Sequence, residues 1–374
     1  MRRSSVCQNE GSGPFCDVEY DFLVGVTRVT RASKPRLAVL ISAVFMSVMF
    51  MAHVAAQTYV NPVVTPVAAD PSVIRAPDGT FYLYATQDDW ADGQGSHYLP
   101  IFKSKDLVTW TYLKDALPAP PAWKEDGGFT WAPDISFRDG TYYLYYAASL
   151  WGDPNPCIAL ATSKNPEGPF EDLGRPVFCS QDIGVGNSID PFVWNGGKVR
   201  TVVWGSGQGI YAVNLSEDGT RAVGKPVQLA GDALYYEAPY LIRRKGFYYL
   251  FLSAGSCCEG ENSTYTLYVG RSRELTGPYL DKEGRSLLED GGSVVIPAND
   301  TWVGPGHNAV IRDDAGNDWV FYHAIPRDDP RLTNGVNRRP VLTDHIVWRG
   351  GWPTVNGGAG PSTTPQPAPT VSAP

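Results

Sequence analysis

The chain has 374 residues, of which 39 are glycine and 31 are proline, and 12% are aromatic. Its formal net charge is −8 and it carries no basic stripe, which argues against a nucleic acid partner and favours a neutral or weakly charged substrate. No long segment has apolar residues at helical spacing, so this composition predicts many short strands joined by turns.

Residues 1–56 have the pattern of an N-terminal extension followed by a secretion signal. A basic flank ends at Arg36, an uncharged apolar run extends from Leu37 to Met51, and Val54-Ala55-Ala56 supplies small residues for cleavage. The apolar run is short for a membrane span. We therefore expect a secreted, extracellular protein without a stable membrane anchor, and we expect it to be a monomer.

A repeated unit opens five times between residues 57 and 356, which we take as the folded domain. Each unit begins with a polar cluster, continues into a short apolar strand, turns tightly, and returns as an aromatic-rich strand. The repeat spacing of roughly 50–70 residues, with turn signals inside each unit, is typical of a propeller or solenoid. The residues that open the units are Asp70, Asp134, Asp190, Glu237 and His307.

Further elements recur inside the units. Tight turns are expected at sites such as Asp139-Gly140 and Lys245-Gly246. A third strand is similar in three units, at 100–110, 158–170 and 268–279, and each copy ends in an aromatic residue that we expect to pack between units. Because each unit then has the strands of one blade, the sequence predicts an all-β, five-bladed β-propeller.

Four cysteines follow the secretion signal, and export makes disulfides favourable. A bond between Cys157 and Cys179 would close a loop of about 20 residues and contribute roughly 3 kcal/mol. Cys257 and Cys258 are adjacent, and a bond between them, cross-pairing and free thiols all remain open. A zinc site is disfavoured because no C-x-x-C spacing occurs.

The C-terminal residues 357–374 are rich in Gly, Pro, Ser and Thr and lack periodicity. This composition predicts a disordered tail.

The innermost strands of a propeller line its channel, so the residues that open the units should meet at one end of it. Burying several carboxylates together is costly unless they share protons or bind a cation, so such a cluster indicates function. Three carboxylates beside aromatic residues suggest the cleavage of a glycosidic bond, in which one acid protonates the leaving oxygen and another group activates water.

The segments Ala69-Asp70-Pro71, Trp131-Ala132-Pro133-Asp134, Ser188-Ile189-Asp190-Pro191 and Glu237-Ala238-Pro239-Tyr240 resemble the signature blocks of glycoside hydrolase family 43. Two further segments, Ser256–Tyr265 and Gly304–Asn308, resemble the arabinan endo-1,5-α-L-arabinosidases of that family. The resemblance implies a five-bladed propeller and hydrolysis that inverts the anomeric configuration.

The same resemblance implies roles for individual residues. Asp70 matches the general base, Glu237 matches the general acid, and Asp190 matches the third carboxylate, which raises the pKa of the acid and orients it. For inversion, the acid and base carboxyls should lie about 6.5–9.5 Å apart. Trp131 matches a tryptophan at the sugar site, with core packing as the alternative. Asp134 opens its blade beside Trp131 in the substrate-binding region, but it lies outside the family's catalytic trio, so we expect a structural or water-ordering role for it.

His307 matches a histidine that faces a metal, usually calcium, in the central channel, with water completing the coordination. Calcium prefers oxygen ligands, so a hydrogen-bonded histidine on an inner strand is the alternative. No organic cofactor is expected. Trp90, Trp151 and Trp204 are more consistent with core packing than with a sugar subsite.

Two features leave the substrate open. Ala69 precedes Asp70 where arabinanases often carry a histidine, and the long 86–97 loop would shape the cleft. Either Arg338 or Arg339 could reach the sugar, and the spacing does not choose between them. We expect plant cell-wall arabinan as the partner.

The alternatives are an exo-acting α-L-arabinofuranosidase or β-xylosidase and, in other classes, a non-catalytic carbohydrate-binding propeller or a retaining fructan or sucrose hydrolase. The non-catalytic propeller would lack at least one of the three carboxylates. The retaining hydrolase would carry an Asn-Asp-Pro-Asn-Gly type motif, which is absent.

Overall fold

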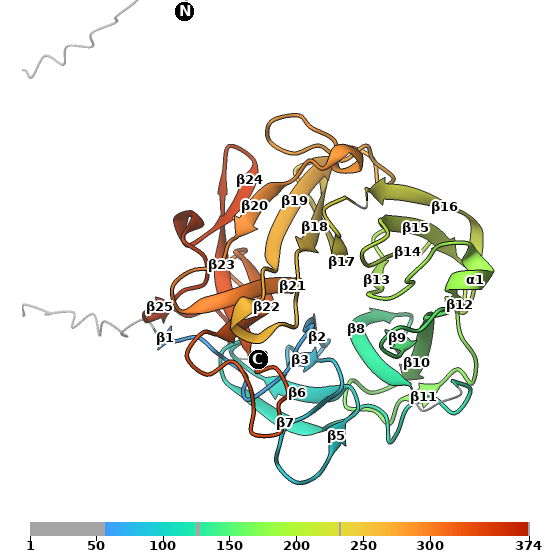
Figure 1. Ribbon diagram of the computed structural model, residues 1–374, viewed down its shortest axis with the longest axis horizontal. Coiled ribbons are helices and arrows are strands. Elements are labelled where there is room, and N and C mark those ends of the chain that lie inside the picture. Colours follow the sequence, from blue (N-terminus) through green and yellow to red (C-terminus); the bar gives the residue numbers. More distant parts are fainter. Residues whose placement is uncertain (1–56, 125–127, 232, 373–374) are drawn as a thin grey trace, which may run out of the picture. The chain divides into compact units, whose positions relative to one another are not determined.

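The computed structural model describes residues 57–124, 128–231 and 233–372, so the segment predicted to be a secretion signal lies outside the described residues. Five antiparallel sheets of four main strands form five blades around a ring, which confirms the predicted fold (Figure 1). No helix in the described ranges is long and apolar enough to cross a membrane.

Each blade is formed by strands that follow one another along the chain. Blades 1 and 2 contain β2 (Ser72–Arg75), β3 (Phe81–Tyr84), β6 (Pro100–Ser104) and β7 (Trp110–Asp115), and β8 (Phe129–Arg138), β9 (Thr141–Ser149), β10 (Cys157–Ser163) and β11 (Glu171–Asp172), with β12 (Phe178–Cys179) also paired to β10. Blades 3 and 4 contain β13 (Phe192–Trp194), β14 (Thr201–Trp204), β15 (Ile210–Leu215) and β16 (Ala222–Ala230), and β17 (Glu237–Arg244), β18 (Phe247–Ala254), β19 (Thr266–Ser272) and β20 (Ser293–Ile296). Blade 5 contains β21 (Trp302–Arg312), β22 (Asp318–Pro326), β23 (Val341–Arg349) and β24 (Trp352–Val355).

Short elements connect or extend the blades. They are the hairpin β4 (Asp88–Asp89) and β5 (Ser96–His97), the helical turns α1 (Ser180–Ile183), η1 (Gly260–Asn262), η2 (Leu287–Glu289) and η3 (Asn356–Gly358), and the pair β1 (Thr58–Tyr59) and β25 (Gln366–Pro367).

The first strand of every blade lies nearest the axis of the ring. These strands contact one another in the closed order β2, β8, β13, β17, β21 and back to β2. Residues on them that point inward therefore share one central region, although they come from segments far apart in the sequence (Figure 1).

Aromatic and aliphatic side chains fill the interfaces between neighbouring blades. A separate hydrophobic cluster lies at each of the five interfaces. Phe170 of blade 2 packs edge-on against Tyr84 of blade 1, and Trp110 of blade 1 packs edge-on against Phe321 of blade 5, with ring centroids 5.9 and 5.8 Å apart. The aromatic residue that ends the repeated third-strand segment thus packs between blades, as predicted.

The predicted hairpin turns take a conformation that suits the twist of the strands. Asp139 and Gly140 both have positive φ, at 51° and 73°, and Lys245 and Gly246 have φ of 47° and 80°. Positive φ at both central residues is the mark of a type I′ turn, which matches the right-handed twist of a hairpin.

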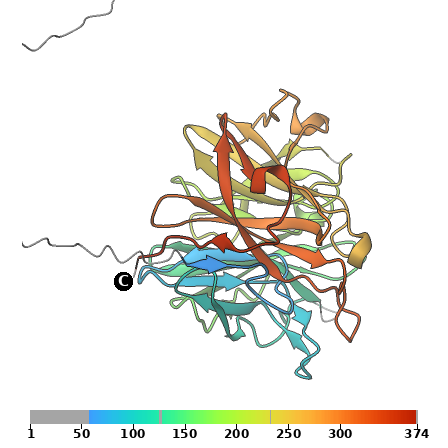
Figure 2. The ribbon, with the colours of Figure 1, turned by 90° about the vertical axis from the view of Figure 1, so that its left-hand side faces the viewer.

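The two ends of the described chain join along blade 5. Strand β1 pairs with β25, and Val64 bridges Val341 of β23. In Figure 2, the red C-terminal segment runs beside the blue N-terminal strand. These contacts help to close the ring between its last blade and its first.

The prediction of a disordered tail is wrong for residues 357–372. Ser362 is 2% exposed and donates its backbone N–H to Asp344, while its hydroxyl accepts from Asn61 at 2.9 Å. Ala368 donates to the carbonyl of Gln57, and Thr370 donates to the carboxylate of Asp313. The segment is fixed by these polar contacts and by Ala368 and Val371, which pack against the cluster between blades 1 and 5, so its contacts follow no regular period.

Both cysteine pairs are bonded in the structure. Cys157 and Cys179 lie opposite each other on β10 and β12 and form the predicted disulfide. Cys257 and Cys258 form the second disulfide, between adjacent residues, which settles the alternatives that the sequence left open.

Candidate active site

One backbone irregularity recurs on the axial segment of every blade. A non-glycine residue has positive φ there, and in four blades a proline follows it, which cannot donate a ladder hydrogen bond. Such a conformation is uncommon outside glycine and concentrates at functional sites. The five residues, here called the bulge residues, are Asp70, Ala132, Asp190, Ala238 and His307, with φ of 57°, 49°, 57°, 54° and 49°.

Four of the five bulges are held by a side chain from the preceding blade. In each case the backbone N–H of the bulge residue, which the distorted ladder leaves free, finds a polar side chain as acceptor. The pairs are Asp70 to His323 Nδ1 (3.2 Å), Ala132 to Thr86 Oγ1 (2.8 Å), Ala238 to Asp190 Oδ2 (3.1 Å) and His307 to Ser253 Oγ (2.8 Å). The polar residues at the axis therefore also join the blades.

A cavity of about 370 Å³, here called the carboxylate cavity, brings the predicted catalytic residues together. Asp70, Asp190 and Glu237 all line it, as do Trp131 and His307. Five of the six residues predicted for the catalytic, substrate and metal sites thus meet in one place.

The Asp70 carboxylate lies among donors and a cation. It accepts a hydrogen bond from Thr86 Oγ1, its Oδ1 is 3.2 Å from the Nδ1 atoms of both His307 and His323, and Arg339 is 3.7 Å away. Burial alone would raise its pKa, but these neighbours outweigh burial and lower the pKa below its ordinary value. Asp70 is therefore an ionised carboxylate, as a base that accepts a proton from water must be.

Glu237 and Asp190 have the opposite tendency. Burial, together with the charge of Asp70, raises the pKa of Glu237 to about 7, although hydrogen bonds from Ser206 (2.7 Å) and Tyr265 oppose the rise. Burial and the charges of Glu237 and Asp70 raise the pKa of Asp190 well above its ordinary range. This carboxyl pair therefore holds a proton at neutral pH, next to an ionised carboxylate.

Trp131 lies at the wall of the carboxylate cavity within a group of aromatic rings. Its ring stacks on Phe129 with centroids 5.4 Å apart and packs against Trp151 at 5.3 Å. Trp151 is 73% exposed and lines the cavity, so the expectation that it is a core residue is wrong. Trp204 is fully buried, as expected for the core.

Asp134, which was predicted beside the substrate, does not line the carboxylate cavity. Its carboxylate accepts the backbone N–H of Val193 at 2.8 Å and so joins blade 2 to blade 3. The cause is its place in the strand, two residues beyond the bulge at Ala132. This contact agrees with the structural role expected for Asp134, and its part in substrate binding stays a prediction.

His307 lies on the wall of the carboxylate cavity beside Asp70. Its Nδ1 faces the Asp70 carboxylate, and burial lowers its pKa to about 4, which keeps the imidazole neutral. Among the described residues, no three His, Cys, Asp or Glu side chains are placed to hold a metal. Calcium takes six to eight oxygen ligands, so these side chains do not fit that ion by themselves. Calcium at His307 stays a prediction, which metal analysis of the purified protein would check.

The structure selects Arg339 over Arg338 at the site. Arg339 lines the carboxylate cavity between Asp70 and Asp88 of β4, and its Nη2 is 3.2 Å from the Asp88 carboxylate. Arg338 instead pairs with Asp329 outside the cavity. The long loop predicted at 86–97 thus orients a cation toward the base.

Several site residues carried no recognisable sequence signal. Thr86, Ser206, Tyr265 and His323 contact Asp70 or Glu237, yet each is a common residue type at the end of a strand or in a loop. The repeat offered one clue, because Thr86 follows the aromatic strand of its unit directly.

Comparison with known proteins agrees with this geometry. The model of the family described as glycosyl hydrolases family 43 matches residues 59–353, almost all of the propeller. The chain belongs to glycosyl hydrolase family 43. It is therefore a glycoside hydrolase, as the sequence predicted.

Curated relatives of two kinds are similar to this family 43 chain. The extracellular exo-α-(1→5)-L-arabinofuranosidase of Cellvibrio japonicus is 35% identical over 315 residues, which cover 77% of this chain and 86% of the relative. The extracellular endo-α-(1→5)-L-arabinanase 1 of Bacillus subtilis is 35% identical over 298 residues, covering 76% and 86%. These relatives therefore do not decide between exo and endo action.

Solved structures of arabinanases are similar to this chain as well. The α-L-arabinanase of Cellvibrio cellulosa complexed with arabinohexaose superposes with a TM-score of 0.67 and 32% identity, covering 78% of this chain and 96% of that one. The GH43 endo-arabinanase of Bacillus licheniformis has a TM-score of 0.65 and 32% identity, covering 78% and 98%.

Proposed function

We propose that the protein is an extracellular, inverting arabinanase that cleaves α-1,5-L-arabinofuranosidic bonds within arabinan. The observation that carries the proposal is the pairing, in one cavity, of an ionised carboxylate at Asp70 with a protonated carboxyl pair at Asp190 and Glu237. The extracellular relatives that act on α-1,5-linked arabinose support the substrate and the location.

The proposed reaction is a single displacement. Asp70 takes a proton from a water molecule as the water oxygen bonds to the anomeric carbon, and Glu237 gives its proton to the glycosidic oxygen as the old bond breaks. Asp190 stays beside Glu237, whose charge it feels, and the hydrogen bond from the backbone N–H of Ala238 holds its carboxyl in place. The product has the opposite anomeric configuration, and exchange with water restores both carboxyl groups.

The first test is substitution of the acid and the base. Asp70→Asn and Glu237→Gln should each lower kcat on linear arabinan by at least about a hundredfold, because proton transfer by a positioned group contributes roughly 10²–10⁴-fold. Both variants should fold, as judged by circular dichroism. Near-normal turnover in either variant would refute the assignment.

The second test follows the product. NMR during the first turnovers should show the inverted anomer, and chromatography should show mixed oligosaccharides. Release of arabinose alone would favour the exo-acting arabinofuranosidase, and preference for xylo-oligosaccharides would favour the β-xylosidase. A retained anomer would contradict the single displacement.

A further inference from the structure

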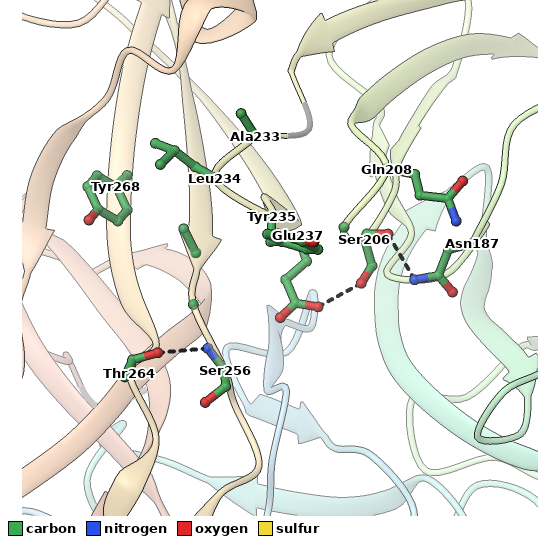
Figure 3. Close-up of a pocket in the computed structure, with 13 residues that line it drawn as sticks. Asn187, Ser206, Gln208, Ala233, Leu234, Tyr235, Glu237, Ser256, Thr264 and Tyr268 are labelled. Atoms are coloured by element: carbon green, nitrogen blue, oxygen red, sulfur yellow. Dashed lines mark hydrogen bonds between the residues drawn. The ribbon is translucent and has the colours of Figure 1, made fainter.

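A second, larger cavity adjoins the carboxylate cavity at Glu237. It has a volume of about 810 Å³ and lies between blades 3 and 4 (Figure 3). The two cavities share Asn187, Ser206 and Glu237, whereas Asp70 and Asp190 line only the first. The second is here called the Tyr235 cavity.

The position of Glu237 fixes the order of the two cavities along a bound chain. The sugar that is attacked must lie where the base and the acid both reach it, which is the carboxylate cavity. The departing oxygen lies at the acid, so the rest of the leaving chain continues on the side of Glu237 away from Asp70. The Tyr235 cavity occupies that side.

The walls of the Tyr235 cavity suit a neutral, hydroxyl-rich ligand. Glu237 is the only acidic or basic side chain among the described residues that line it. Hydroxyl and amide groups come from Ser256, Thr264 and Gln208, and in Figure 3 Leu234 and Tyr268 lie on the opposite side of Glu237 from Gln208. Unsubstituted furanose rings match this combination of hydrogen-bonding and apolar surface.

Tyr235 has the features of a platform for a sugar ring. It is 68% exposed, although a tyrosine gains by burying its ring, and its φ of 52° is unusual for a bulky residue. Its ring lies close over Gly207, where an added Cβ would be 3.4 Å from Cδ1 of the tyrosine. The backbone N–H of Gly207 donates to the carbonyl of Tyr236 at 3.0 Å, which fixes this segment against blade 3.

We infer that the Tyr235 cavity binds the leaving-group side of arabinan, with Tyr235 as its stacking residue. This inference rests on the proposed function and adds to it the direction in which the substrate lies. The arabinose units on the reducing-end side of the cleaved bond lie between blades 3 and 4, and those on the other side extend past Trp131 and Trp151.

The experiment uses α-1,5-linked L-arabinopentaose labelled at its reducing end, and records which bond is cut. Loss of the platform weakens binding of the leaving side, so in Tyr235→Ala the labelled fragment should be shorter on average and kcat/KM should fall roughly tenfold. Tyr235→Phe keeps the ring and should retain the wild-type pattern. Trp151→Ala should shift cleavage in the opposite direction, toward longer labelled fragments.

Two further variants control for indirect effects. Leu234→Ala, in the same wall, should shift the pattern in the same direction as Tyr235→Ala but less. Val223→Ala removes an exposed side chain on β16, outside both cavities, and should change neither the cleavage pattern nor kcat/KM.

An unchanged pattern and kcat/KM in Tyr235→Ala would overturn the inference while leaving the proposed function intact. The inference would also be overturned if Tyr235→Ala lowered kcat/KM equally for arabinobiose and arabinopentaose. An effect that does not depend on the length of the substrate would indicate a merely structural role for Tyr235. A wild-type enzyme that does not cut the pentaose would contradict the proposed function itself. If the wild type released only arabinose, the proposal of endo action would be refuted. The dependence of the kcat/KM loss in Tyr235→Ala on substrate length would then still test the inference.

Discussion

The axial ends of blades 2 and 3 each carry a buried aspartate, and the proposed reaction uses only the one in blade 3. Asp134 accepts the backbone N–H of Val193 in blade 3, and Asp190 accepts that of Ala238 in blade 4, at 2.8 and 3.1 Å. Both carboxyls have a raised pKa, and burial is the first cause in both. As structural links between blades they are equivalent.

Their surroundings separate them. Asp190 is itself a bulge residue, lines the carboxylate cavity and feels the charges of Glu237 and Asp70. In blade 2 the bulge residue is Ala132, so Asp134 lies two positions further along the strand, away from the cavity. The comparison teaches that the place of a carboxylate relative to the bulge, rather than its presence at the start of a blade, decides whether it lines the carboxylate cavity.

The sharpest test of this difference is Asp190→Asn. An amide keeps an acceptor for the N–H of Ala238 but removes the titratable carboxyl that interacts electrostatically with Glu237. We expect kcat/KM on linear arabinan to fall about 10²–10³-fold, within the range for disturbed acid–base catalysis. Burial and like charge raise the pKa of the carboxyl pair, so removing one member should move the loss of activity at high pH to lower pH.

The pH profile separates a catalytic effect from a structural one. An Asp190→Asn variant with low activity but an unshifted profile would indicate that Asp190 acts only as a blade link, like Asp134. Thermal unfolding of the same preparation would show whether the link itself is kept.

A second pair of residues allows the same comparison at hydroxyl groups. Thr86 holds the bulge of blade 2 and donates to Asp70, whereas Ser72 accepts the N–H of Ile135, at 3.1 Å, and donates to Asp134. Thr86→Val and Ser72→Ala should each lower the free energy of unfolding by about 1–3 kcal/mol, the cost of leaving a buried N–H without a partner.

Activity should distinguish these two variants. Thr86→Val should also lower kcat/KM by roughly tenfold, because one charge-assisted hydrogen bond to the base is lost, while Ser72→Ala should keep the wild-type value. Equal activity losses in both would mean that any weakened link near the axis disturbs the site, and the distinction between the two regions would fail. Urea denaturation and initial rates on linear arabinan provide both measurements.

The fold was predictable from the sequence because each blade repeats the same local pattern. Gly-containing turns, alternating aromatic strands and a polar opening recur in chain order, and each unit specifies its own hairpin. The offset of the bulge was not predictable in the same way. Asp134 and Asp190 both open a repeat, and the prolines at 133 and 191 align Ala132, not Asp134, with Asp190, but only the backbone shows that this aligned position is the bulge.

The site was predictable where a residue's chemistry was distinctive, and less so where it was common. Three carboxylates beside Trp131 were found from their spacing and resemblance. Thr86 and His323 were not, because they come from neighbouring blades and act through contacts that only the closed ring creates. The tail at 357–372 was missed for a related reason, since its partners in blade 5 are distant in the sequence.

We expect the smallest effect on activity for Asp134→Asn. The direction of its effect on the free energy of unfolding follows from the pKa of Asp134. Burial raises the pKa of Asp134 to about 7, so between about pH 4 and pH 7 the folded state binds a proton that the unfolded state has lost. This contribution lowers the stability of the wild type as the pH rises through that window. Asparagine cannot ionise, yet it can still accept the N–H of Val193.

The free energy of unfolding of Asp134→Asn should therefore rise relative to that of the wild type as the pH rises from about 4 to about 7. Above that pH the difference should stay constant. The total gain should be at most a few kcal/mol, since one pKa unit corresponds to ~1.4 kcal/mol. Its kcat/KM on arabinan should stay within about twofold of the wild-type value. Urea denaturation at several pH values measures the first quantity. A pH-independent stability difference would show that Asp134 is ionised in its link to blade 3, and a large loss of activity would return it to the active site beside Asp190.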